Sequence, residues 1–134
     1  MRLAAAAALL AGCSATAGET YHEANGLFAE GRYSEAIPLY ESVIAVRDRM
    51  KDAYHRLAYC HEVRGEESRA VETLEKVLRV DRLDEYALRH LWRLYCHRGF
   101  PEQALAMAGG LSELYPDDRG LRDEVARLKG LKGK

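Results

Sequence analysis

Apolar residues recur at helical spacing in the middle of this sequence, on both sides of Gly65. On each side of this glycine, apolar residues lie one, three or four positions apart: Tyr54, Leu57 and Ala58 before it, and Ala70, Leu74, Val77 and Leu78 after it. Such spacing puts side chains on one face of a helix. The pattern predicts two helices, each with one buried face, joined by a short turn at the glycine.

The same arrangement occurs three times along the chain. A glycine and an alanine each recur at steps of 34 residues, and these residues are Gly31, Gly65, Gly99, Ala36, Ala70 and Ala104. A period of 34 residues is the length of one tetratricopeptide repeat. The sequence therefore resembles the tetratricopeptide repeat (TPR) family over residues 20–118, in units 17–50, 51–84 and 85–118.

The resemblance implies an all-α fold, a right-handed superhelical array of three TPR helix pairs plus a C-terminal capping helix. In each pair the glycine would end helix A in a left-handed conformation. The alanine would lie where helix B crosses helix A, where a larger side chain would separate them. Pro116 falls on the usual proline position between units.

The third unit departs from the family pattern. Trp92 stands at a position that is usually small, and Ala108, followed by Gly109 and Gly110, stands where a large aromatic residue is usual. We expect the indole to fill the space that the small residues leave. The two glycines also weaken helix B, by about 1 kcal/mol each relative to alanine.

A capping helix is predicted over residues 119–129. Asp117 and Asp118 provide a helix N-cap signal, and Leu121, Val125 and Leu128 form one apolar stripe. A polar face on the other side would end the array in water. Residues 130–134 are expected to fray.

The N-terminus predicts an export signal. Arg2 is followed by an uninterrupted apolar run that is too short to span a bilayer and that ends in Leu10-Ala11-Gly12-Cys13. The last four residues resemble a bacterial lipobox. The resemblance implies removal of residues 1–12, fatty acylation of Cys13 and a tether over 13–19. Because Ser14 is not the aspartate that retains such lipoproteins in the inner membrane, we expect an outer-membrane anchor facing the periplasm.

Charge and composition narrow the classes of function. A formal net charge of −1 gives the chain no overall attraction to nucleic acid. The sequence carries no Ser/His/Asp signature, no phosphate-binding glycine loop and no paired acids in a predicted pocket. We expect no enzyme activity, no cofactor and no metal. Adjacent helical residues point about 100° apart, so Cys60-His61 and Cys96-His97 do not suit one ion. A disulfide between Cys60 and Cys96 stays open, against two partly buried thiols.

The TPR resemblance also implies a ligand site, since helix A of each unit lines a concave channel in that family. Carried over position by position, the predicted partner-binding groove comprises Tyr21, Asn25, Phe28, His55, Arg56, Tyr59, Glu62, Tyr86, Arg89, His90, Arg93 and His97. Tyrosine and arginine often dominate binding energy at interfaces. The arginines favour an acidic protein or peptide ligand. The dicarboxylate clamp of chaperone-binding TPR domains is absent, because Asn25 alone of its residues is present.

These features predict a non-catalytic protein–protein interaction module. The chain would be a membrane-anchored periplasmic lipoprotein that serves as an adaptor or assembly factor of the pilus, secretion or envelope type. The alternative is a structural component of an envelope complex that self-associates through an exposed segment, residues 106–110.

Overall fold

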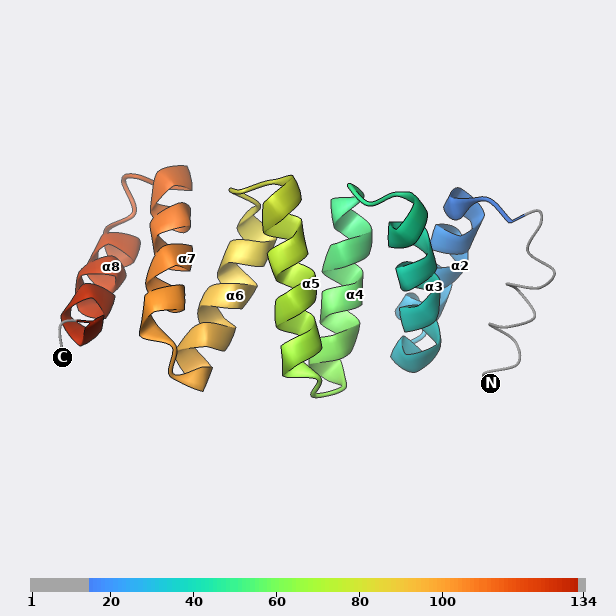
Figure 1. Cartoon of the computed structure of the whole chain (residues 1–134), viewed down its shortest axis with the longest axis horizontal. Coiled ribbons are helices and arrows are strands. Elements are labelled where there is room, and N and C mark those ends of the chain that lie inside the picture. The colour runs from blue at the N-terminus through green and yellow to red at the C-terminus, as the bar shows by residue number, and fades with distance from the viewer. Residues whose placement is uncertain (1–14, 133–134) are drawn as a thin grey trace. The chain divides into compact units, whose positions relative to one another are not determined.

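The structure is a computed structural model that describes residues 15–132. Within that range the chain forms helices and no strand. The helices are α2 (Ala17–Ala29), α3 (Tyr33–Val46), α4 (Lys51–Val63), α5 (Glu67–Val80), α6 (Glu85–Arg98), α7 (Pro101–Leu114) and α8 (Arg119–Lys132). They form an all-α repeat array, and Figure 1 labels each helix.

The helix boundaries follow the 34-residue period of the sequence. Helices α2, α4 and α6 begin at residues 17, 51 and 85, and their partners α3, α5 and α7 begin at 33, 67 and 101. The starts of α6 and α8 are separated by the same interval, at 85 and 119. Helix α8 therefore stands in the register of helix A of a further, incomplete unit.

The repeated glycines have the backbone conformation that the sequence predicts. Gly31, Gly65 and Gly99 have φ angles of 74°, 75° and 76°, and they are the residues with positive φ in the described part of the chain. A Cβ atom added at any of them would meet nothing within 4 Å. Glycine is therefore required by the left-handed backbone and not by lack of space.

Side-chain caps begin several of the helices. Asp118 accepts a hydrogen bond from the Leu121 amide at 3.0 Å, which confirms the predicted cap of α8. Asp84 accepts from the Ala87 amide at 2.9 Å at the start of α6. Thr16 caps α2 in a capping box with Glu19. These caps satisfy amides that the helices cannot pair internally.

The chain divides into two compact units between Thr73 and Leu74, within α5. We call residues 15–73 unit N and residues 74–132 unit C. In unit N, α3 packs against both α2 and α4. Its fully or almost fully buried core consists of Ala24, Ala36, Tyr40, Val43, Ala53, Leu57 and Cys60. The small residues allow the helices to approach, and the larger ones fill the space between them.

In unit C, α7 packs against both α6 and α8. Leu88, Leu111 and Leu121 supply one buried side chain from each helix, and Trp92 packs against this cluster. Trp92 is partly buried, and Ala108 of α7 is fully buried in the same unit. The exchange of volume between these two positions stays a prediction.

The segment 106–110 differs from the expectation of an exposed self-association surface. Ala106 is exposed, but Ala108 is fully buried, and the other three residues are half-buried. A Cβ atom on Gly110 would lie only 3.0 Å from a Leu88 methyl group. Gly110 thus packs against α6 and Ala108 is buried, so these two small residues are not available for close contact with a second copy.

The C-terminus also differs from its prediction. Helix α8 continues to Lys132, although fraying was expected from residue 130. Gly130 lacks the positive φ of the helix-ending glycines, so it does not terminate the helix. Leu121 and Leu128 are buried as predicted and fix α8 to unit C. Residues 133–134 and the predicted signal and lipid-attachment residue, Cys13, lie outside the described residues.

Candidate functional site

The structure divides the predicted groove residues between the two units. Unit N carries Tyr21, Asn25, Phe28, His55, Arg56, Tyr59 and Glu62, on α2 and α4. Unit C carries Tyr86, Arg89, His90, Arg93 and His97, all on α6. Each set is a surface of its own unit. The two surfaces have different chemistry.

Unit N presents an aromatic cluster formed by Phe28, Tyr33, Tyr40 and Tyr59. The Phe28 ring centre lies 5.4 Å from that of Tyr33, 6.4 Å from that of Tyr40 and 5.3 Å from that of Tyr59. Tyr33 and Tyr59 are 5.7 Å apart. Tilted and edge-on contacts of this kind are the favoured geometry for aromatic pairs. The cluster runs from the buried Tyr40 to Tyr59, which is 39% exposed.

Polar groups border this cluster. The Arg56 guanidinium lies over the Phe28 ring, 5.1 Å from its centre. The Tyr40 hydroxyl donates to Asn25 Oδ1 at 2.7 Å, so that amide oxygen already has a partner within the unit. Burial raises the pKa of Tyr40 to about 12, and the hydroxyl therefore remains a donor at neutral pH. Tyr21 packs edge-on against Tyr40, with ring centres 6.1 Å apart.

The remaining two predicted residues of unit N lie along α4. His55 Nδ1 is 4.0 Å from Asp52 Oδ1, one turn away on the same helix. Glu62 is half-buried, and its carbonyl oxygen accepts from the Gly65 amide at 3.0 Å in the turn that follows. The sequence placed both on the same face as Tyr59.

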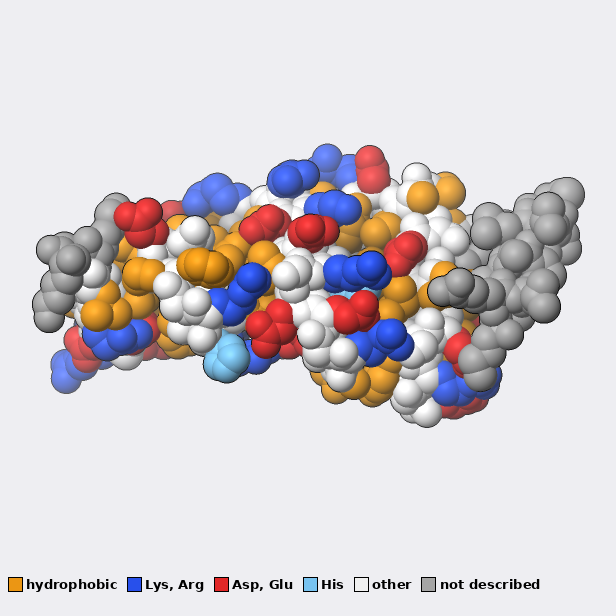
Figure 2. All heavy atoms as spheres, turned by 60° about the horizontal axis from the view of Figure 1, so that its bottom comes forward, with side chains coloured by type: hydrophobic (Ala, Val, Ile, Leu, Met, Phe, Trp, Pro, Cys, Tyr) orange, Lys and Arg blue, Asp and Glu red, His pale blue; other side chains and the backbone are white. Residues whose placement is uncertain are grey.

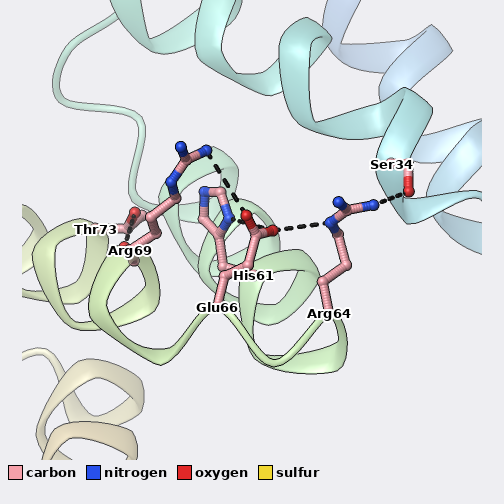
Figure 3. A network of polar contacts seen from close by, with 6 residues as sticks. All are labelled: Ser34, His61, Arg64, Glu66, Arg69 and Thr73. Atoms are coloured by element: carbon pink, nitrogen blue, oxygen red, sulfur yellow. Dashed lines mark hydrogen bonds and ion pairs between the residues drawn. The ribbon is translucent and has the colours of Figure 1, made fainter.

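A polar network joins the turn after α4 to α3 (Figure 3). Glu66 Oε1 accepts from Arg64 Nε at 2.8 Å and lies 3.4 Å from Nδ1 of the buried His61. Arg64 also donates to the Ser34 hydroxyl on α3. The hydrogen bond from Arg64 is the main reason that the pKa of Glu66 lies below its usual range. Because the network pairs a buried histidine, we assign it a structural role in the turn.

In unit C, the groove residues begin with a stacked pair. The rings of Tyr86 and His90 lie 4.1 Å apart and are inclined by 24°. Arg89 Nε binds Glu85 Oε1 at 2.8 Å, and its guanidinium lies 5.6 Å from the centre of the Tyr115 ring. Tyr115 in turn donates to Glu85 at 2.6 Å. Two partners thus fix the position of Arg89.

A pocket of about 470 Å³ lies between α6 and α8 in unit C. We call it the α6–α8 pocket, and its lining residues are Arg89, His90, Trp92, Arg93, Cys96, Glu124 and Arg127. Its volume is in the range of known ligand sites. Three guanidinium groups face one carboxylate, so the lining carries an excess of positive charge. One of the three, Arg89, is already bound to Glu85 outside the lining.

The sequence pattern did not predict Glu124 and Arg127 as site residues. The sequence pattern assigned them to the solvent side of a capping helix, opposite the apolar stripe. The signal was nevertheless present, because α8 continues the 34-residue register. In that register Glu124 and Arg127 correspond to His90 and Arg93 of α6, which were predicted to bind. Extending the 34-residue period past the third unit therefore predicts both residues.

The two cysteines in the described residues have different environments. Cys60 is fully buried in unit N, and burial raises the pKa of its thiol to about 11. Cys96 is exposed at the α6–α8 pocket, which corrects the expectation of two partly buried thiols. Burial of the sulfur nevertheless raises its pKa too. Both thiols are free in the structure, and neither is activated as a nucleophile.

Metal binding and membrane spanning can be assessed for the described residues. Among residues 15–132, no three histidine, cysteine, aspartate or glutamate side chains gather as a possible metal-ligand set. No helix in the described part of the chain combines the length and apolar character needed to cross a membrane.

Charges of both signs occur on the surface of the protein. On the face drawn in Figure 2, basic and acidic side chains are interspersed with hydrophobic ones. This mixture matches the formal net charge of −1. The excess of positive charge is thus a local property of the α6–α8 pocket, and it does not extend over the whole protein.

Comparison with known proteins agrees with the repeat pattern. Residues 27–89 match the tetratricopeptide repeat family. No curated protein sequence matches the chain.

Solved structures show the same fold. The first TPR of Spaghetti, bound to an HSP90 peptide, has a TM-score of 0.67 and 17% identity, over 88% of this chain and 94% of that one. The Yersinia enterocolitica type III secretion chaperone SycD, in complex with a peptide of the translocator YopD, has a TM-score of 0.69 and 14% identity, over 87% and 94% of the two chains. At these identities the likeness concerns the fold alone.

Proposed function

Because this chain is a tetratricopeptide repeat protein, we propose that it is a non-catalytic interaction module that binds a segment of a partner protein. The residues that would bind are the exposed and half-exposed side chains of the helix A positions. Two solved proteins of this fold hold peptides, one from HSP90 and one from a translocator, which supports a peptide ligand. The sequence contains no motif for an enzymatic reaction.

The α6–α8 pocket is the observation that carries this proposal. It is large enough for side chains of a peptide, and arginine and tryptophan, which line it, are residue types enriched in binding hot spots. Its excess of guanidinium groups favours an acidic segment. The aromatic cluster of unit N offers a second, more apolar surface, suited to hydrophobic side chains of a ligand.

We also propose that the module is held at the cell envelope by fatty acyl chains on Cys13. Support comes from the apolar run and the Leu-Ala-Gly-Cys sequence at the N-terminus. Several acyl chains on one residue give stable membrane attachment, because each buried methylene contributes about 0.8 kcal/mol. In this proposal the protein is an outer-membrane lipoprotein that faces the periplasm and acts as an adaptor or assembly factor, of the pilus, secretion or envelope type.

Crosslinking and affinity capture from the native cell would test the binding surface. The wild-type protein is compared with the double variant Arg89→Glu and Arg93→Glu, which reverses two charges at the α6–α8 pocket. The matched control is Arg119→Glu with Arg122→Glu, which reverses two exposed charges on α8 outside the pocket lining. We expect partners to be lost from the first variant and kept by the control.

Circular dichroism and thermal melting would show that both double variants remain folded. This check is needed because Arg89 also binds Glu85. If a folded Arg89/Arg93 variant still captures the same partners, the proposed binding surface is wrong. The intact mass of the captured protein tests the anchor separately. A mass that retains residues 1–12 and carries no acyl chain would contradict the lipoprotein proposal.

A further inference from the structure

The turn between α3 and α4 exposes an apolar side chain that the later repeats cover. Val46, the last residue of α3, is 76% exposed, the highest value among the large hydrophobic residues of the described part of the chain. Val80 and Leu114 occupy the same position in the next two repeats, and both are half-buried. Leu114 packs against the core of unit C. Exposure at this position is therefore specific to the first repeat.

The charge of this turn also differs from that of its counterparts. Arg47 and Arg49 are exposed and flank a single aspartate, Asp48. At the residue before the next helix the two later turns have Asp84 and Asp118, which cap α6 and α8, whereas α4 begins after a methionine and has no side-chain cap. Within residues 15–132, neither guanidinium group takes part in an ion pair or hydrogen bond. Basic charge thus replaces the acidic charge of the other turns.

The backbone of the turn is fixed by the rest of unit N. The hydroxyl of the buried Tyr54 donates to the Asp48 carbonyl at 2.9 Å, and the Met50 amide donates to the Arg47 carbonyl at 3.2 Å. The Met50 side chain packs against the core of the unit. The exposure of Val46 is therefore a property of an ordered turn. An apolar side chain beside cations suits the boundary between lipid headgroups and acyl chains.

This turn lies at the end of unit N where the proposed lipid anchor enters the fold. Helices α2 and α3 pack as an antiparallel pair, so the start of α2 at Ala17 and the end of α3 at Val46 share one end of the unit (Figure 1). Thr16, which caps α2, is three residues after Cys13. Three extended residues span at most about 11 Å. Acyl chains on Cys13 would therefore hold this end of unit N at the membrane surface.

The other charges at this end do not offset the two arginines of the turn. Lys51 and Asp52, in the first turn of α4, carry opposite charges. Glu19, in the first turn of α2, accepts from the Thr16 amide at 2.7 Å and is engaged in the cap. Attraction between basic side chains and anionic headgroups acts only within about a Debye length. Residues beside the anchor are the ones that satisfy this condition.

We propose that the α3–α4 turn docks on the anionic phospholipid surface in which Cys13 is anchored. Val46 enters the boundary between headgroups and acyl chains, and Arg47 and Arg49 bind headgroup phosphates. The contact fixes the orientation of unit N on the membrane, which a short tether alone leaves free. This inference rests on the proposed lipid anchor and adds a second point of membrane contact to it.

A tryptophan in the turn would report contact with lipid. Val46→Trp is introduced into the full-length protein together with Trp92→Phe, which removes the sole natural tryptophan. The acylated protein is reconstituted into vesicles of equal parts phosphatidylglycerol and phosphatidylcholine, with bromine atoms on the acyl chains to quench nearby indoles. The matched control is Val63→Trp, at the other end of α4, where the side chain is 51% exposed. We expect strong quenching for Val46→Trp and little for Val63→Trp.

Charge variants would test the role of the arginines. One basic side chain near an anionic membrane contributes about fivefold to binding, so Arg47→Gln with Arg49→Gln should lower the ratio of docked to undocked turn by roughly tenfold to thirtyfold. Vesicles of phosphatidylcholine alone should give a similar loss. Arg119→Gln with Arg122→Gln removes equal charge from the exposed surface of α8 and should leave the quenching unchanged.

The intact mass of the protein is measured first. A protein without acyl chains contradicts the lipoprotein proposal, and the docking proposal fails with it. If the acylated Val46→Trp protein is quenched no more than Val63→Trp, docking is wrong and the anchor stands. Quenching that persists unchanged in the Arg47/Arg49 variant also overturns the proposal. If quenching is absent and that variant loses protein partners from the cell, the turn binds a protein and not lipid.

Circular dichroism would verify that each variant is folded. Trp92 is half-buried, so its replacement can affect unit C. If Trp92→Phe lowers the helix content, Val46→Trp and Val63→Trp are made with Trp92 retained, and the signal of the wild type is subtracted. The difference in quenching between the two positions then decides the proposal in the same way.

Discussion

The two units are built on one repeat but expose different chemistry. In unit N the helix A positions gather around Phe28 and Tyr59, and the Arg56 guanidinium lies over the Phe28 ring. In unit C the equivalent positions of α6 are charged, and Arg89 and Arg93 line a pocket with residues of α8. One surface suits apolar side chains, and the other suits a carboxylate.

The buried positions do not show this difference. Ala36 and Ala104 are fully buried in their respective units, and Gly31 and Gly99 have almost the same φ angle. Packing between helices restricts these positions, because a change in volume there is felt by the neighbouring helix. The outward positions of helix A carry no such restriction. The comparison teaches that one scaffold can present two kinds of binding surface without a change in its core.

The largest expected effect comes from matched cavities in the two cores. Leu57 and Leu91 occupy the same position of consecutive repeats, and their exposed fractions are 3% and 0%. Replacing either with alanine should reduce the free energy of unfolding by about 2–5 kcal/mol. Urea unfolding followed by circular dichroism measures the loss, and Leu131→Ala, at a position 46% exposed, is the control.

Hydrogen exchange on these two variants would sharpen the comparison. If the units are energetically separate, Leu57→Ala lowers amide protection mainly in unit N, and Leu91→Ala lowers it mainly in unit C. Equal loss across the described helices in both variants would contradict that separation. The repeat array would then unfold as one cooperative body.

A smaller effect is expected at the turns, where the units should behave alike. Gly31→Ala and Gly99→Ala place a Cβ atom at a positive φ, which costs about 1–2 kcal/mol. The two losses should be equal, because neither site has a neighbour within 4 Å of the added atom. Thermal melting measures both. Gly109→Ala, inside α7 and also without a close neighbour, should instead stabilise the protein by up to about 1 kcal/mol.

A tyrosine in unit N should give a pH-dependent effect of lesser size. Burial raises the pKa of Tyr40 from its ordinary value of 10.0 to about 12. Its contribution to stability is therefore complete below pH 10 and is lost as the pH rises through 12. Tyr40→Phe should cost about 0.5–1.5 kcal/mol at neutral pH, through loss of the hydrogen bond to Asn25, and should flatten this part of the profile.

Equilibrium unfolding between pH 8 and 12 would record that profile. Unit C contains a counterpart, Tyr95, whose hydroxyl donates to Glu75 at 2.6 Å and whose pKa is also raised by burial. Tyr95→Phe is the matched variant for unit C. If stability falls with rising pH in Tyr40→Phe as it does in the wild type, ionisation of Tyr40 does not limit the stability of unit N.

The smallest effect is expected for an exposed ion pair of unit C. Arg82 binds Glu113 through two hydrogen bonds, at 3.2 and 2.8 Å, but both side chains are more than half exposed. Arg82→Gln should change the melting temperature only slightly, and less in 1 M salt. Arg82 lowers the pKa of Glu113 below 4.5, so the small contribution is present above that pH and is lost on acidification. A large loss at neutral pH would contradict this ranking.

The sequence alone determined the repeat, the turns and one helix cap. The 34-residue spacing of glycine and alanine predicted the all-α fold, because a left-handed turn and a close helix crossing each permit few residue types. The same reasoning found Asp118 as the cap of α8. It also placed Tyr59, Arg89 and Arg93 on outward positions of helix A. Periodicity is sufficient for such predictions, since it follows from local geometry.

Only the tertiary structure decided how these outward residues combine. The contact between Phe28 and Tyr33, the Tyr40 hydrogen bond to Asn25 and the pairing of Glu124 with Arg127 in one pocket with Trp92 depend on side-chain packing between helices. The burial of Ala108 likewise depends on how α7 packs within unit C. A repeat pattern specifies which face a residue occupies, but rotamers and neighbouring helices determine what it touches.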